Sequence, residues 1–199
     1  MSAFNVRKDY TLEDDCVLLR PLQTDDVQHL LPFSLNEPGL WKYSLLPVAG
    51  EENLQNYIQI ALKGREEEKE YPFIVYDKRK SAYAGSTRFY DIQLSQKTMQ
   101  LGYTWYGAEF HGTGLNKHCK YLLLEFAFDE LDMERVEFRA DINNERSIAA
   151  MKSIGCVVEG VLRANTIKAD GTRRDSIVLS ILKKEWEDGV KKRLKDKLT

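Results

Sequence analysis

The sequence predicts an α/β (α+β) fold in which a mixed, mostly antiparallel central sheet is flanked by helices. Three apolar segments joined by short polar turns, typical of an antiparallel meander, occupy residues 71–76, 83–90 and 98–105. Residues 116–131 then lack Gly and Pro, and their apolar residues recur at helical spacing. No linker, repeat or low-complexity segment divides the 199 residues, so we expect residues 1–199 to form one domain.

The part of the chain before the meander predicts an arm, a strand and two helices. Residues 1–15 are polar and are expected to form an irregular arm, and residues 16–20 form a short apolar strand. Thr24, followed by two aspartates, is typical of a helix start, and we expect Pro32 to end that helix. Apolar residues between 54 and 62 recur at i, i+3, i+4, i+7 and i+8, which predicts an amphipathic helix.

The part of the chain after the long helix predicts alternating strands and short helices. Residues 136–140 read as a strand, and residues 143–155 contain a short helix that a glycine ends. Strands at 157–162 and 175–182 are joined by an Asp-Gly turn, the signature of a hairpin. Residues 183–199 carry an apolar stripe on a basic helix, which we expect to pack back on the body.

Charge and cysteine content exclude several classes of function. The formal net charge is −2, from 29 basic and 31 acidic residues, so there is no bulk attraction to nucleic acid or to anionic membrane. No apolar run has the length of a signal peptide or a membrane span, and we expect a soluble, cytoplasmic protein. The three cysteines, Cys16, Cys119 and Cys156, show no CxxC spacing. Neither a metal site nor a disulfide framework is expected, and the compartment should be reducing.

A glycine loop connects the third strand of the meander to the long helix. Gly107, Gly112 and Gly114 mark this loop, and the helix follows from Asn116. Unpaired backbone N–H groups and the positive end of the helix dipole would meet at this point. Such a point is a natural anion site, and phosphate esters are the usual anion. The loop therefore indicates a phosphate-bearing ligand, with an ordinary strand-to-helix turn as the alternative.

A series of short motifs spans nearly the whole chain in a fixed order. They lie at residues 18–22, 25–26, 85–88, 101–104, 112–117, 135–136, 143–147, 154–155, 159–160, 170–171 and 174–175. Each motif is weak alone, but their shared order and spacing resemble the GNAT superfamily of acetyl-CoA-dependent N-acetyltransferases. The local sequence is most similar to the branch that acetylates the N-termini of ribosomal proteins.

The resemblance implies that two central strands splay apart and that acetyl-CoA lies in the gap as co-substrate, with no metal. The pantetheine arm would bond to the strand before the glycine loop, and the loop amides would bind the pyrophosphate. The implied acetyl-CoA residues are Tyr103, Thr104, Trp105, Gly112, Thr113, Gly114, Leu115, Asn116, Lys117 and Asn144. The family's loop pattern begins with Gln or Arg, and Glu109 stands at that position here.

The resemblance also assigns catalytic groups. Amine acetylation needs a neutral amine, a polarised thioester carbonyl and an acid for the leaving thiolate. The tyrosine that many members use as acid is replaced by Met151, whereas Ser147 matches the serine that the ribosomal-protein branch uses. Ser147 as a helix cap is the alternative reading. The branch's glutamate base corresponds to Thr166, and the nearest other candidates by sequence are Glu109, Asp91 and His111.

The acceptor is expected to be a primary amine that attacks acetyl-CoA directly in a ternary complex. With no obvious base, an α-amine suits the chain better than a lysine, because roughly a tenth of an α-amine is neutral at pH 7. We therefore expect a protein N-terminus or a small-molecule amine as the partner, and a monomer or homodimer. By position in relatives, Trp41, Tyr43, Arg88 and Tyr90 would line the acceptor side.

Two other classes of function remain open from the sequence. A CoA-binding module with little or no turnover would explain the missing tyrosine and glutamate. A dinucleotide-binding protein would place its glycine turn near the first strand of a parallel sheet. Here the loop follows an antiparallel meander past mid-chain, which argues against that second alternative.

Overall fold

The computed structural model describes residues 4–198 and contains one open sheet of eight strands. The strands are β1 (Leu12–Glu13), β2 (Val17–Pro21), β3 (Tyr71–Asp77), β4 (Ala82–Gln93), β5 (Thr98–Tyr106), β6 (Arg135–Asp141), β7 (Val157–Ile167) and β8 (Arg173–Leu182). They lie in the order β1-β2-β3-β4-β5-β6-β8-β7. Neighbouring strands are antiparallel except β5 and β6, which are parallel. The predicted mixed, mostly antiparallel sheet is confirmed.

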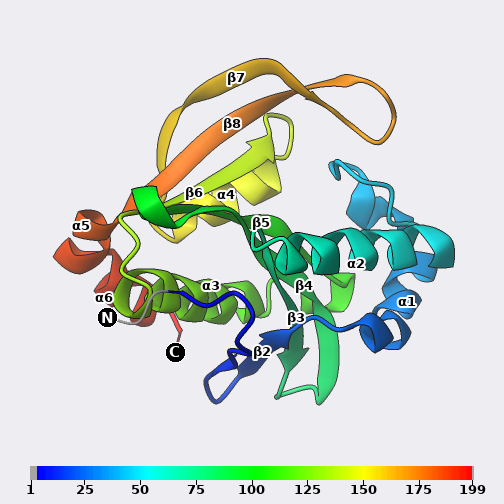
Figure 1. Cartoon of the computed structure of the whole chain (residues 1–199), viewed down its shortest axis with the longest axis horizontal. Coiled ribbons are helices and arrows are strands. Elements are labelled where there is room, and N and C mark those ends of the chain that lie inside the picture. Colours follow the sequence, from blue (N-terminus) through cyan, green and yellow to red (C-terminus); the bar gives the residue numbers. More distant parts are fainter. Residues whose placement is uncertain (1–3, 199) are drawn as a thin grey trace.

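Helices flank this sheet (Figure 1). They are α1 (Val27–Asn36), α2 (Glu51–Glu66), α3 (Leu115–Glu125), α4 (Glu145–Ser153), α5 (Lys183–Glu185) and α6 (Lys191–Lys195). Helices α1 and α2 pack together at the β2–β4 end of the sheet, and α3 lies beside α6. The long β7–β8 hairpin arches away at the other end (Figure 1). No helix within residues 4–198 is long and apolar enough to cross a membrane.

The core lies between the sheet and the apolar faces of α2 and α3. On α2, the predicted stripe is buried, with Leu54, Ile58 and Ala61 almost fully covered. On α3, Leu115 and Leu123 are likewise buried. Full burial of a side chain of leucine or isoleucine size stabilises the fold by about 1.5–3 kcal/mol, which explains why these periodic residues fix both helices on the sheet.

Two expectations for the first 36 residues need correction. The predicted irregular arm contains strand β1, in which Leu12 pairs with Leu19 of β2; residues 1–3 lie outside the described residues. The first helix does not end at Pro32 but continues to Asn36. The turn beyond the proline is held from outside, because the buried Ser34 hydroxyl donates to the carbonyl of Val48 at 2.6 Å.

The C-terminal segment packs back on the body, as expected, but it is not one straight helix. A π-helical turn, Trp186–Val190, separates α5 from α6, and Gly189 has φ of 146°. Trp186 is fully buried, and its indole N–H donates to Asp129 at 3.0 Å. The segment is therefore anchored to the end of the α3 region.

Candidate active site

The site is centred on an irregularity in β5. Thr87 of β4 faces two residues of β5, Tyr103 and Thr104, and Tyr103 has a positive φ of 49°. Such a bulge bends its strand away from its neighbour. Accordingly, β5 pairs with β6 only through residues 98–100 and 135–137, and the two strands diverge beyond that point. The predicted splay between the central strands is present.

The glycine loop lies at the open end of this splay. Gly112 and Gly114 have φ of 74° and 86°, which only glycine adopts readily. Within residues 4–198, no hydrogen bond leaves the backbone N–H groups of Gly112, Thr113, Gly114 or Asn116. Helix α3 begins here and adds the positive end of its dipole. The loop can therefore bind an anion such as a pyrophosphate through four free donors.

The splay and the loop open into one cavity of about 1140 Å³, larger than the roughly 300–1,000 Å³ of ordinary ligand sites. Its lining includes most residues predicted from the sequence, namely Trp41, Tyr43, Tyr90, Tyr103, Thr104, Trp105, Gly112, Gly114, Asn116, Lys117, Asn144 and Ser147. Thr113, Leu115 and Arg88 are not part of the lining. Leu115 points into the core instead, where it is fully buried.

Arg88 lies behind the site and not in it, contrary to expectation. Its guanidinium carbon is 3.8 Å from the centre of the Tyr103 ring and 4.9 Å from that of Tyr57. The same guanidinium forms a buried ion pair with Glu70 at 2.5 Å. Arg88 thus packs against Tyr103 of the bulged strand from outside the cavity, and its positive charge is paired with Glu70.

The segment before α2 forms part of the cavity wall. The Trp41 ring packs edge-on against Trp105 of β5, with centroids 4.7 Å apart. The Tyr43 hydroxyl donates to the carbonyl of Asn143 at 2.9 Å, across 100 residues of sequence. This bond joins the loop before α2 to the turn after β6, so residues that lie far apart in the sequence line the same cavity.

Helix α4 brings Ser147 to the cavity. Asn144 caps this helix, and its side-chain oxygen accepts a hydrogen bond from the Ser147 backbone N–H at 3.1 Å. The Ser147 hydroxyl itself makes no hydrogen bond within residues 4–198. Met151, at the position of the missing tyrosine, also lines the cavity. The cap belongs to Asn144, which leaves the Ser147 hydroxyl available to a ligand.

His111 is engaged at both ring nitrogens. Its Nε2 contacts the carbonyl of Tyr106 at 2.8 Å, and Arg146 donates to its Nδ1 at 2.9 Å. These two partners assign a tautomer with the proton on Nε2 and the Nδ1 lone pair taken by arginine. His111 is therefore a poorly placed proton acceptor, although it lines the cavity.

The other sequence candidates for a base are also occupied or remote. Glu109 is exposed, pairs with Lys80 at 3.0 Å and does not line the cavity. Asp91 lines the cavity, but one of its oxygens accepts from Gln100 at 2.7 Å. Thr166 also lines the cavity, and a threonine hydroxyl does not act as a base near neutral pH. No carboxylate base emerges from these positions.

Lys120 of α3 also lines the cavity. It is only 5% exposed, and its amine donates to the Thr104 hydroxyl at 2.8 Å. Burial lowers its pKa to about 8. Burial also raises the pKa of the adjacent Cys119 and Cys156 thiols to about 12, so neither offers it a counter-charge. A titratable amine thus lies next to the bulged strand.

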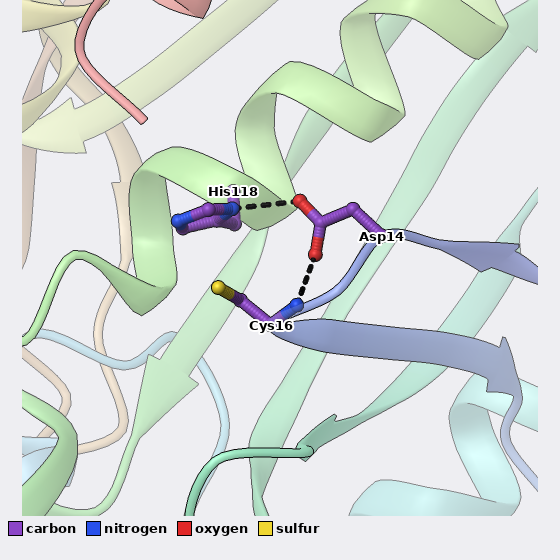
Figure 2. A group of neighbouring side chains, drawn as sticks. All are labelled: Asp14, Cys16 and His118. Carbon is purple, nitrogen blue, oxygen red and sulfur yellow. Dashed lines mark hydrogen bonds and ion pairs between the residues drawn. The ribbon is translucent and has the colours of Figure 1, made fainter. Parts of the chain in front are cut away.

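A second group of reactive side chains, Asp14, Cys16 and His118, lies outside the cavity (Figure 2). Their ligand-type atoms lie within 4.8 Å of one another. His118 Nδ1 is 2.6 Å from one Asp14 oxygen, and the other oxygen accepts from the backbone N–H groups of Cys16 and Val17. Thiolate, imidazole and carboxylate are zinc ligands, so the expectation of no metal stays a prediction.

Comparison with known proteins supports the same family. Residues 17–157 match the model of the Acetyltransferase (GNAT) domain. YdaF of Bacillus subtilis (strain 168), provisionally named a ribosomal N-acetyltransferase, is 31% identical over 114 residues, 57% of this chain and 60% of that protein. The N-acetyltransferase p20 of Bacillus licheniformis is 25% identical over 177 residues, 88% of this chain and 98% of that protein. A structure from T. thermophilus, provisionally described as an acetyltransferase, is 33% identical, with a TM-score of 0.86 and full coverage of both chains.

The chain therefore belongs to the acetyltransferase (GNAT) domain family. Its class is that of an acetyl-CoA-dependent N-acetyltransferase, and the fold predicted from the resemblance is the fold observed. The name of YdaF puts that relative in the ribosomal branch, which is the branch that the sequence motifs indicated.

Proposed function

We propose that the protein transfers the acetyl group of acetyl-CoA to a primary amine by direct attack in a ternary complex. The acceptor class that we propose is a protein N-terminal α-amine or a small-molecule amine. One observation carries this proposal: a single cavity joins the free amides of the glycine loop to an aromatic acceptor side, past the bulge in β5. Both substrates can therefore meet in one place without a covalent enzyme intermediate.

The residues present fit acetyl-CoA. The free amides of residues 112–114 and 116 suit the pyrophosphate, and Lys117 in the lining adds a positive charge. The unpaired edge of β5 at Tyr103, Thr104 and Trp105 suits the amides of the pantetheine arm, as a missing strand would. When bound, acetyl-CoA supplies the thioester that the amine attacks.

Ser147 is the residue that we assign to proton donation. Its hydroxyl lines the cavity without a partner among the described residues, so it can donate to the leaving thiolate. Trp41, Tyr43 and Tyr90 line the acceptor side and would exclude water around the attacking amine. Asn144 also lines the cavity, and its side-chain oxygen caps α4.

The α-amine preference follows from the absence of a free carboxylate base at the candidate positions. A lysine amine is neutral at well below 0.1% near pH 7, whereas an α-amine is neutral at roughly a tenth. An enzyme without a strong general base should therefore acetylate an α-amine faster than a lysine amine. The provisional name of YdaF, a ribosomal N-acetyltransferase, adds support for an acceptor of the ribosomal type.

Thiol release from acetyl-CoA over an amine panel tests the function. The panel pairs peptides with a free N-terminus and no lysine against N-terminally blocked peptides with one lysine, and adds small-molecule amines. We expect release with α-amines and at least tenfold lower kcat/KM with lysine. A clear preference for lysine contradicts the acceptor class. Tight acetyl-CoA binding with no release on any amine would favour the CoA-binding module instead.

A further inference from the structure

Arg174 is a charged cavity residue whose charge the fold does not satisfy. It lies near the start of β8, lines the cavity and is only 7% exposed. Its Nε is buried without a partner, and none of its guanidinium nitrogens donates a hydrogen bond or forms an ion pair within residues 4–198. A buried charge without a partner is costly. A side chain that carries this cost while facing a cavity indicates that a ligand supplies the partner.

None of the charged groups near Arg174 forms a direct contact with it within residues 4–198. Arg139 pairs with Glu137 at 2.7 Å. Asp141 favours the charged form of Arg174 through space, but one of its oxygens accepts two hydrogen bonds from Asn143 and it forms no ion pair with Arg174. Asp141 therefore compensates this guanidinium only from a distance, and no carboxylate within residues 4–198 is hydrogen-bonded to it.

Two phenols complete a set of donors near Arg174. The Tyr90 and Tyr103 rings lie edge to face with centroids 5.1 Å apart, and both residues lie within electrostatic range of Arg174. Burial raises the pKa of both phenols, so they remain protonated donors. Neither hydroxyl makes a hydrogen bond within the described part of the chain. Both residues line the cavity.

We propose that the acceptor amine carries a carboxylate or phosphate, which Arg174 binds with the Tyr90 and Tyr103 hydroxyls as further donors. The planar guanidinium can hold two oxygens of such a group side by side. Because Tyr103 is also the bulge residue of β5, the anion would anchor the acceptor beside the strand that lines acetyl-CoA. This inference rests on the proposed acetyltransferase function and narrows its acceptor.

Matched acceptors test the subsite. Peptides that begin with Glu or Gln, 4-aminobutyrate and its amide, and phosphoethanolamine and ethanolamine differ in the anionic group. We expect each anionic member to show a KM at least tenfold lower than its neutral partner. The first two pairs test a carboxylate and the third tests a phosphate, so the results show which anionic group the subsite prefers. Equal kcat/KM within every pair overturns the inference while leaving the acetyltransferase function intact.

Variants separate binding from folding. Arg174→Met should raise the KM for the preferred anionic acceptor at least tenfold and leave neutral acceptors unchanged, and Arg174→Lys should restore part of the loss. Arg173→Met, on the exposed neighbouring residue of β8, is the matched control. Equal loss on all acceptors in Arg174→Met would indicate a structural role and contradict the proposal.

A binding measurement decides the case in which no amine is acetylated. Inorganic phosphate and acetate are titrated into the protein at saturating CoA, so that the glycine loop is already filled. We expect the melting temperature to rise with anion concentration in the wild type and not in Arg174→Met. No rise in the wild type contradicts the subsite, whereas a rise without acetylation contradicts the proposed function alone.

Discussion

The amine of Lys120 donates a hydrogen bond to the Thr104 hydroxyl at 2.8 Å, inside the cavity and beside the bulge of β5. A helix residue on α3 and a strand residue on β5 thereby meet where the two central strands diverge. The amine has no carboxylate partner within residues 4–198. Its protonated form is consequently disfavoured in the folded protein.

Replacing Lys120 with Met should raise stability near pH 7. The folded pKa of about 8, against the usual 10.5, means that the folded state binds fewer protons than the unfolded state between these values. The penalty for burying the charged Lys120 amine therefore falls as pH rises from 8 to 10.5, and the stability of the wild type rises by the same amount. The shift corresponds to about 3 kcal/mol at 1.36 kcal/mol per pKa unit. Denaturant unfolding should show Lys120→Met more stable below pH 8 by up to this amount, with the gap closing by pH 10.5. A variant that is less stable throughout would contradict a buried, destabilised ammonium.

Replacing Ser147 with Ala should lower kcat roughly a hundredfold, in line with loss of a general acid. Helix α4 should remain folded, because the Asn144 cap bonds to the backbone N–H of Ser147 and not to its hydroxyl. The KM for acetyl-CoA and the melting temperature should stay near wild type. Ser147→Thr keeps a hydroxyl and should retain more activity than Ser147→Ala. Equal activity of Ser147→Ala and wild type would leave proton donation to another group.

Replacing Gly114 with Ala should weaken acetyl-CoA binding. An added Cβ meets no atom within 4 Å, so the cost is the backbone strain of φ at +86°, about 1–2 kcal/mol. Relief of that strain would turn the free amides away from the pyrophosphate. Gly171→Ala is a matched control, because Gly171 has φ of +82°, open surroundings and a place on the distant hairpin. Calorimetry should show several-fold weaker CoA binding in Gly114→Ala alone, despite similar stability losses in both variants.

Replacing Asp14 with Asn should lower stability at pH 7 by about 1–3 kcal/mol, since His118 and the turn before β2 lose a charged acceptor. Burial raises the pKa of Asp14, but hydrogen bonds from His118, Val17 and Cys16 outweigh it and hold the pKa below its usual 3.8. The carboxylate's stabilisation is therefore present above pH 3.8 and is lost as pH falls through the folded pKa. Acid titrations should show the difference between variant and wild type shrinking below pH 3.8. A difference that does not change with pH would assign the effect to shape alone.

Much of the fold could be predicted because periodic burial decides it. The stripe on α2 follows directly from helical apolar spacing, and the three meander strands follow from apolar segments separated by polar turns. Pro32 was misjudged because the contact that holds the following turn, from Ser34 to Val48, is not local. Strand β1 was missed because its two residues are ordered only by pairing with β2.

The site was predictable where backbone geometry alone makes it, as in the loop at Gly112 and Gly114. Lys120 and Arg174 are not among the site residues predicted from the sequence. Lys120 opens the stripe that Leu123, Leu124 and Ala127 continue at i+3, i+4 and i+7, and all four are buried. Arg174 alternates with Ser176, Val178 and Ser180, whereas the apolar stripe of β8 is Ile177, Leu179 and Ile181, so its position in the pattern gives no signal of burial. A charged residue in phase with the core face of a helix, such as Lys120, indicates a cavity, but only the fold shows which groups surround it.

The short pairing of β5 with β6 has a consequence for how the protein comes apart. Three residue pairs are the ladder that joins the strands β1–β5 to the strands β6–β8. A ligand bound between the diverging strands β5 and β6 would therefore stabilise the contact between these two parts of the sheet. Without the ligand, we expect strands β5 and β6 to separate before either part of the sheet unfolds. Within the sheet, hydrogen exchange of backbone amides should then be fastest along β5 beyond Gln100. The protein would then be least stable at the end of each turnover, when the product leaves the space between β5 and β6.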